Sequence, residues 1–118
     1  MKPNVYEQLK DDLSANEPSR RYEAAILIGN CEEMLATPRT RELLEMLYPL
    51  LQDPHNHVRY YAIEAIGRFM EKGSIHYLMR CMETVSEVEC GSGEGITHAG
   101  LLKHIQRTIE VIRGQNEA

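Results

Sequence analysis

The stretch from Leu51 to Gly67 reads LQDPHNHVRYYAIEAIG, and the earlier stretch from Leu13 to Gly29 reads LSANEPSRRYEAAILIG. Aligned without a gap, the two share six identical residues at a constant offset of 38, as from Arg21 to Arg59. A fixed period of this length is typical of stacked supersecondary units. Such a stack usually presents a binding surface instead of a catalytic centre.

The bulk composition narrows the class of protein. The chain has 118 residues, which suits a single domain, and its apolar and charged fractions of 42% and 26% are ordinary for a globular protein. A net charge of −5 argues against nucleic acid or a membrane surface as partner, since both require a basic field. No apolar run approaches a membrane span, and the N-terminal stretch lacks the apolar core of a signal peptide. The three cysteines form no C-x-x-C pair, which predicts free thiols and a cytoplasmic location.

Apolar periodicity predicts six helices and no strand. We expect them at about 4–15, 18–29, 38–51, 55–70, 74–88 and 97–113, with Gly29-Asn30 as a stop and Pro49 weakening the end of the third. Paired in order, they give one domain over 1–113, with units at about 4–30, 38–71 and 74–113 and a frayed tail at 114–118. The predicted fold class is therefore all-α, a right-handed α-α superhelix (α-solenoid) of about three helix pairs.

The pattern L-x-D-P-x-x-x-V-R-x-x-A-x-x-A-I-G in the second unit resembles the HEAT-repeat family, and looks closest to the short HEAT-like repeats of phycobilin lyases. In that family an aspartate of the turn and an arginine of the second helix form a ladder between repeats. The resemblance therefore implies structural ladder roles for Asp53, Arg59 and Arg21. In the first unit Ala15 occupies the aspartate position, which leaves Asn16 or Glu17 as the substitute.

Candidate chemical motifs are weak, and we predict no enzyme activity, no metal and no cofactor. His55 and His57 are two apart at a helix start, so their side chains should point away from each other and into solvent. The glycine-rich segment 90–95 precedes a helix but lacks the ending of a phosphate-binding loop. The adjacent His-Glu pairs of iron-binding HEAT proteins do not occur, and no catalytic spacing of Ser, His and Asp is present.

The second helix of each pair lines the concave face in HEAT stacks, which makes its non-core residues the candidate site. These are Tyr22 and Ile26 in the first unit and Tyr60, Tyr61 and Glu64 in the second, with Arg20 and Arg68 at the rim. Tyr22 and Tyr60 share one repeat position, so we expect them side by side. Tyrosine is common at interface hot spots. The alternative is that both rings are spacers that pack between helices.

Three functional hypotheses follow. The first is a protein–protein interaction module, or adaptor, which binds a partner protein on the concave face. The second, implied by the resemblance, is a tetrapyrrole (bilin) handling or phycobilin lyase-like subunit. The third is a structural homo-oligomer, such as a homodimer through an uncapped end of the stack.

Overall fold

The computed structural model describes residues 3–31, 40–87 and 97–117, and none of these lies in a β-strand. The described helices are α1 (Pro3–Leu13), α2 (Pro18–Asn30), α4 (Thr40–Leu47), the 3-10 helix η1 (Tyr48–Gln52), α5 (Asn56–Phe69), α6 (Ser74–Glu87) and α7 (His98–Glu117). The expectation of an all-α chain is confirmed. The expected start of the third helix at about residue 38 and the glycine-rich segment 90–95 lie outside the described residues.

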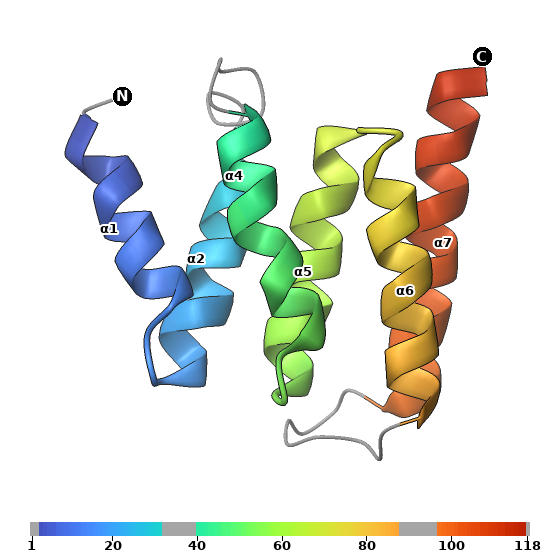
Figure 1. Cartoon of the computed structure of the whole chain (residues 1–118), viewed down its shortest axis with the longest axis horizontal. Coiled ribbons are helices and arrows are strands. Elements are labelled where there is room, and N and C mark those ends of the chain that lie inside the picture. The colour runs from blue at the N-terminus through green and yellow to red at the C-terminus, as the bar shows by residue number, and fades with distance from the viewer. Residues whose placement is uncertain (1–2, 32–39, 88–96, 118) are drawn as a thin grey trace.

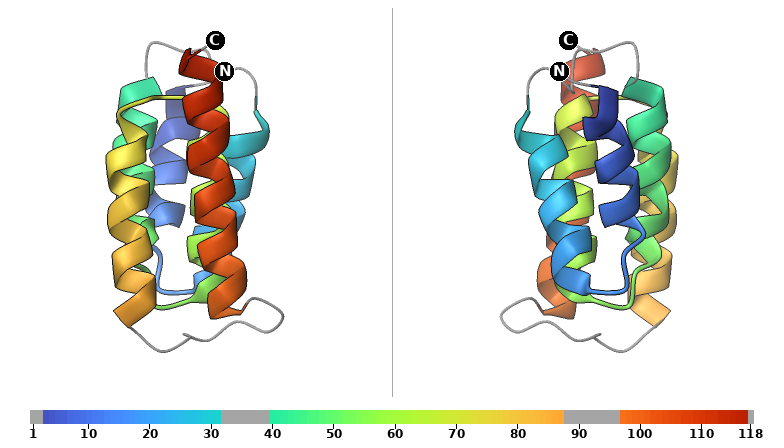
Figure 2. Two further views of the ribbon diagram at one scale, coloured as in Figure 1. Left: turned by 90° about the vertical axis from the view of Figure 1, so that its right-hand side faces the viewer. Right: turned by 90° about the vertical axis from the view of Figure 1, so that its left-hand side faces the viewer.

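The helices form three antiparallel pairs, α1 with α2, α4 and η1 with α5, and α6 with α7 (Figure 1). The first helices of the pairs lie toward one side and the second helices, α2, α5 and α7, lie toward the other, as the edge-on views show (Figure 2). We call these two sides the A side and the B side. The second helices also pack on one another from unit to unit, α2 on α5 and α5 on α7, which is the arrangement of an α-solenoid.

Repeated apolar positions build one core. Ala24 and Ala62 are repeat-equivalent, as are Ile28 and Ile66, and all four side chains are buried. They share the core with the leucine face of α4 and η1 and with Leu101, Ile105 and Ile112 of α7. The period of 38 residues therefore reflects burial, because each unit contributes the same helix face to the same interface.

Pro49 shapes the end of the third predicted helix. The α-helix stops at Leu47, and the chain continues as the 3-10 helix η1 with Pro49 near its start. Proline has no N–H to donate to the carbonyl four residues before it, and its ring crowds that carbonyl. The tighter 3-10 turn accommodates both effects, so the expected weakening takes the form of a change of helix type.

The repeated glycines Gly29 and Gly67 allow close helix contact. A Cβ atom on Gly29 would lie 3.1 Å from the Cα of Ala65 in α5, and one on Gly67 would lie 2.7 Å from Cγ2 of Thr108 in α7. The helix α2 ends at Asn30, which agrees with the expected stop at Gly29-Asn30, and Gly29 in addition allows this close packing. Each glycine is the point where one unit's second helix approaches the next unit's second helix.

Arg21 forms the interhelical rung that the resemblance implied. Its Nε and Nη2 atoms donate to the two carboxylate oxygens of Asp53 in the next unit, at 2.7 and 3.1 Å. Its Nη1 donates to the backbone carbonyls of Ala15 and Asn16 at 2.7 and 2.9 Å. Backbone oxygens therefore replace the missing carboxylate of the first unit, and neither candidate side chain, Asn16 or Glu17, is used for this purpose.

Arg59 is repeat-equivalent to Arg21 but has different surroundings. Its side chain is buried and its Nη2 donates to Oδ1 of Asn56 on the same helix. Within the described ranges its Nε has no hydrogen-bond partner. Asp53, the aspartate of its own unit, pairs with Arg21 and also accepts from the backbone N of His55 at 2.9 Å. The expected pairing of aspartate and arginine is thus seen for Arg21 and Asp53.

Two helix ends differ from the expected boundaries. The last helix, α7, continues to Glu117, four residues beyond the expected end at Arg113, so the predicted fraying at 114–118 does not apply as far as Glu117. Gly114 does not adopt the left-handed conformation that would end the helix there. Met70, with φ of 54°, fills that role at the end of α5. Across the described ranges, no helix has both the length and the apolarity needed to cross a bilayer.

Candidate functional site

A row of aromatic and imidazole rings crosses the B side. The Tyr22 ring centroid lies 5.9 Å from that of Tyr61, and the Tyr61 ring meets the Tyr60 ring edge-on at 5.3 Å. Tyr60 in turn stacks on His104 of α7 at 4.2 Å with an interplanar angle of 17°. We call these residues, together with His55 and His57 beside Tyr22, the ring row. It links α2, α5 and α7, and therefore all three units.

The order of the rings differs from the expected one. Tyr22 contacts the Tyr61 ring, and the expected side-by-side contact with its repeat equivalent, Tyr60, is not among the described ring contacts. All three tyrosines are half-buried and pack against the core. They act as spacers between helices and still expose part of each ring.

His55 and His57 do not point away from each other, and that prediction is wrong. Their ring centroids are 5.4 Å apart, and each ring also lies near Tyr22. His55 is the extended residue before α5, so helical spacing does not set the direction of its side chain. Burial, and then the charge of His57, hold the pKa of His55 below its usual value. In the described ranges no three His, Cys, Asp or Glu residues are grouped to hold a metal ion.

Two hollows flank α5 on the B side. The first, of about 300 Å³, lies between α2 and α5, with Ile26 and Tyr61 in its lining. The second, of about 410 Å³, lies between α5 and α7, with His104 and Val111 in its lining. Both hollows share three residues one and two turns apart on α5: Tyr60, Glu64 and Arg68. We call the two hollows with this shared ridge the groove.

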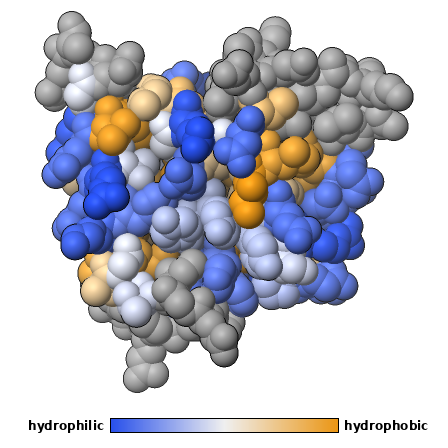
Figure 3. Space-filling view, turned by 180° about the vertical axis from the view of Figure 1, so that it is seen from behind, coloured by the Kyte–Doolittle hydropathy of each residue, from blue (hydrophilic) through white to orange (hydrophobic). Residues whose placement is uncertain are grey.

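The groove has mixed polarity. Hydrophobic residues form separate patches among hydrophilic ones on the face seen from behind (Figure 3). Glu64 on the ridge has Oε1 3.7 Å from Nη2 of Arg68 and Oε2 3.2 Å from Nε2 of His104, although the latter atoms are not aligned for a hydrogen bond. Burial lowers the pKa of His104, and the carboxylate of Glu64 opposes that shift. His104 is therefore a mainly neutral ring near pH 7.

The structure brings most of the predicted site residues together. Ile26, Tyr60, Tyr61, Glu64 and Arg68 line the groove, and Tyr22 lies in the adjoining ring row. Arg20 does not join them and is a correction to the predicted rim.

Arg20 turns toward α1 instead. Its guanidinium pairs with the carboxylate of Asp12 at 2.7 Å and holds the pKa of that carboxyl below its usual value. The rim prediction assigned the positive charge of Arg20 to contact with a partner, whereas in the structure that charge pairs with Asp12.

Sequence reasoning missed the contribution of α7. His104, Thr108 and Val111 line the second hollow and are spaced by four and three residues, which places them on one helix face. That spacing is a readable signal. It was overlooked because the third unit matches the 38-residue repeat poorly, so no equivalent positions pointed to it.

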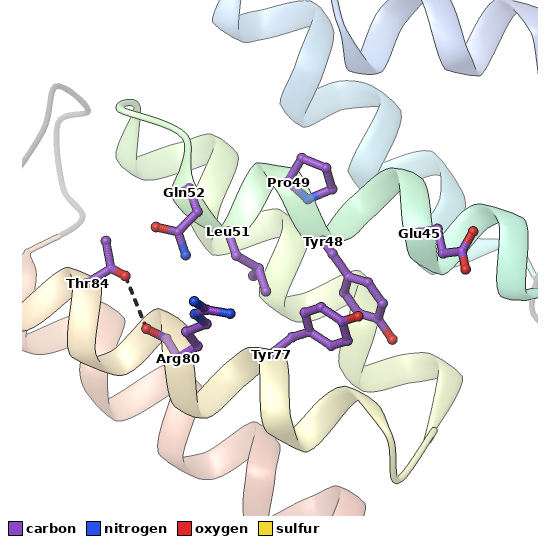
Figure 4. A pocket seen from close by; sticks show the side chains of 8 residues that line it. All are labelled: Glu45, Tyr48, Pro49, Leu51, Gln52, Tyr77, Arg80 and Thr84. Carbon is purple, nitrogen blue, oxygen red and sulfur yellow. Dashed lines mark hydrogen bonds between the residues drawn. The ribbon is translucent and has the colours of Figure 1, made fainter.

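A separate hollow of about 670 Å³ lies on the A side, between η1 and α6 (Figure 4). Its main feature is the stacked pair Tyr48 and Tyr77, with centroids 3.8 Å apart and planes within 9°. The Tyr48 hydroxyl shares a hydrogen bond of 2.8 Å with the hydroxyl of Ser74, and burial raises the pKa of Tyr48. Arg80 and Gln52 extend beside the pair. No sequence pattern predicted this hollow.

Comparison with known proteins gives one match. A family model described as HEAT repeats matches residues 6–89, which is more than half of the chain. No curated protein and no solved structure matches the sequence. The matched range includes both copies of the repeated stretch and the whole of α6.

Proposed function

We propose that this chain, which belongs to the HEAT-repeat family, is a non-enzymatic adaptor that binds a partner protein in the groove on its B side. HEAT repeats are commonly protein-interaction modules. The observation that carries the proposal is the groove itself, which continues over α2, α5 and α7 and combines half-exposed tyrosines with charged side chains. Buried aromatic anchors next to polar groups are the usual make-up of an interaction hot spot.

The proposed location is the cytoplasm. Cys31 and Cys81 are free thiols, and Cys81 is buried, with its Sγ donating to the carbonyl of Leu51 at 3.3 Å. Burial raises the pKa of the Cys81 thiol to about 11, which makes it unreactive. Free structural thiols are typical of a reducing compartment.

The test compares two tyrosine variants that place a carboxylate on opposite sides of the protein. Tyr61→Glu introduces the charge between the two ends of the ring row, and Tyr77→Glu introduces it on the A side. After matching the variants for thermal stability, capture from the source lysate should lose a specific partner with Tyr61→Glu and keep it with Tyr77→Glu. Equal capture by both variants would contradict a B-side site.

A second candidate is the handling of a linear tetrapyrrole. The stacked rings of Tyr60 and His104 provide a flat wall, and Arg68 and Arg107 line the same hollow, where they could pair with the two propionates of a bilin. Mixing the pure protein with a bilin should then shift the visible absorbance of the pigment, and Arg68→Gln/Arg107→Gln should abolish the shift. An unchanged spectrum would dispose of this candidate.

A third candidate, self-association, is favoured by the open face of the last pair. Met79 of α6 is 49% exposed beside a hollow of about 550 Å³ that Met82, Ile109 and Arg113 also line. A twofold dimer through this face would bury the methionines. Sedimentation velocity over a hundredfold concentration range should show a dimer that Met79→Glu dissociates. A monomer at every concentration would rule the dimer out.

A further inference from the structure

The basic side chains of the groove are only partly neutralised. Arg68 lines both hollows, and its one ion pair within the described ranges, to Glu64, is loose at 3.7 Å. Arg107 lines the second hollow, and no described carboxylate lies within ion-pair distance of it. The lining of the two hollows therefore contains two guanidinium groups and one carboxylate, Glu64, which lies beside Arg68 and the ring of His104.

This local excess of positive charge stands out against the rest of the protein. The chain as a whole carries a net charge of −5. Screening at physiological ionic strength limits the reach of exposed charges to about 8 Å, so a group inside the groove responds mainly to Arg68, Arg107 and Glu64, which together are net positive. An acidic group is the complement of this local field.

Apolar side chains lie on either side of the ridge that carries Arg68. Ile26 of α2 lies in the first hollow and is partly buried, and Val111 of α7 lies in the second and is 48% exposed. The Tyr60 ring borders both hollows. A segment that crosses the groove therefore meets an apolar surface, then the ridge with Arg68, then the second hollow, in which Arg107 and Val111 both lie.

We propose that the occupant of the groove is a protein segment with two apolar anchors that flank an acidic residue, whose carboxylate pairs with Arg68 and Arg107. This rests on the proposed function and specifies the chemistry of its partner. The acidic residue is isolated or one of a pair. The two guanidinium groups match one carboxylate with charge-assisted hydrogen bonds, so the further carboxylates of a long acidic run would find no additional cation among the residues that line the groove.

The probe is a random 12-residue peptide library displayed on phage, selected against three forms of the folded protein. These are wild type, Arg68→Glu/Arg107→Glu, and the matched control Arg41→Glu/Arg80→Glu, which makes the same charge change on the A side. Wild type and control should both select peptides with Asp or Glu between apolar residues. The groove variant should lose them and select peptides with Lys or Arg in that place.

Selected peptides are then synthesised and measured by fluorescence anisotropy. The dissociation constant should rise at least about tenfold with Arg68→Gln/Arg107→Gln, which adds no repulsion, and stay within about twofold for the A-side control. Circular dichroism and a thermal melt establish that each variant is folded.

The outcomes separate this inference from the proposed function. Selected peptides that lack an acidic residue, and whose binding is abolished by Tyr61→Glu, would overturn the inference and leave the groove as a protein-binding site. Peptides that bind wild type and Tyr61→Glu equally, or a failure to select any peptide, would overturn both.

Discussion

At the junction of the first and second units, Arg21 has four hydrogen bonds, two to the carboxylate of Asp53 and two to backbone carbonyls. At the junction of the second and third units, the equivalent Arg59 is buried with Asn56 as its described side-chain partner. One reason for the difference is visible in the sequence. Arg21 pairs with Asp53 of the next unit, but the position 38 residues after Asp53 is Gly91, which has no carboxylate. A repeated residue therefore keeps its place in the fold, while its contribution depends on what the next unit supplies.

Among substitutions at the two junctions, Arg21→Met should cause the largest loss of unfolding free energy. The substitution leaves the carboxylate of Asp53, whose side chain is 8% exposed, without its cation. Removing one partner of a buried ion pair costs about 3 kcal/mol of unfolding free energy. Urea denaturation at pH 7 measures the loss. A loss below about 1 kcal/mol would mean that Arg21 and Asp53 are no more coupled than an exposed pair.

Gly67→Ala tests the second junction through its closest contact. The new Cβ would lie 2.7 Å from Cγ2 of Thr108, and overpacking of this kind typically costs about 1–3 kcal/mol. Alanine favours a helix over glycine by about 1 kcal/mol, so the net loss should be about 1 kcal/mol. Adding Thr108→Ser removes the clashing methyl group, keeps the hydroxyl that donates to the carbonyl of His104, and should restore stability. Failure of this rescue would place the strain elsewhere.

Arg59→Met should change the unfolding free energy by less than about 1 kcal/mol in either direction. Among the described residues Arg59 has no ion pair, and replacing such a buried charge by an apolar side chain of similar length removes a desolvation cost along with the hydrogen bond. The same urea titration provides the comparison with Arg21→Met. A loss as large as that of Arg21→Met would show that the two junctions are energetically alike.

The smallest effect that we expect is a dependence of folding stability on pH that originates from His104 at the second junction. Burial lowers the pKa of His104 in the folded state, so the unfolded chain binds more protons and stability falls as the pH drops through about 6.5. His104→Phe keeps a ring against Tyr60 and removes the titration. Unfolding followed at pH 7.5 and 5.5 should show a smaller drop for the variant, with a remainder from His55. An identical drop in both proteins would exclude His104 as its source.

Much of the fold could be predicted from the sequence because local signals and burial agree. The second predicted helix, 18–29, matches α2 at Pro18–Asn30, since proline fixes the start and the apolar stripe defines the inner face. The stop at Gly29-Asn30 also agrees with the end of α2, whereas the close packing of Gly29 on Ala65 depends on the neighbouring helix and was not predicted. The same holds for Pro49, where the sequence indicates a disruption but not the 3-10 turn that resolves it.

The candidate site could be predicted only where it follows the repeat. Ile26, Tyr60, Tyr61, Glu64 and Arg68 were found because α2 and α5 share a pattern. The contact between His55 and His57 was not predicted, because His55 is an extended residue before α5. His104, Thr108 and Val111 were not predicted as site residues, because their positions depend on how the third unit packs on the second. Neither is a property of local sequence.

The stacked tyrosines of the A side also give the protein an optical property. The chain has no tryptophan and only one phenylalanine, so tyrosines dominate its near-ultraviolet spectrum. Tyr48 and Tyr77 are nearly parallel at 3.8 Å, close enough for their electronic transitions to couple. The part of the near-ultraviolet circular dichroism that Tyr77→Leu removes therefore reports on the contact between η1 and α6, and it can follow the separation of the last two units while the helices themselves remain formed.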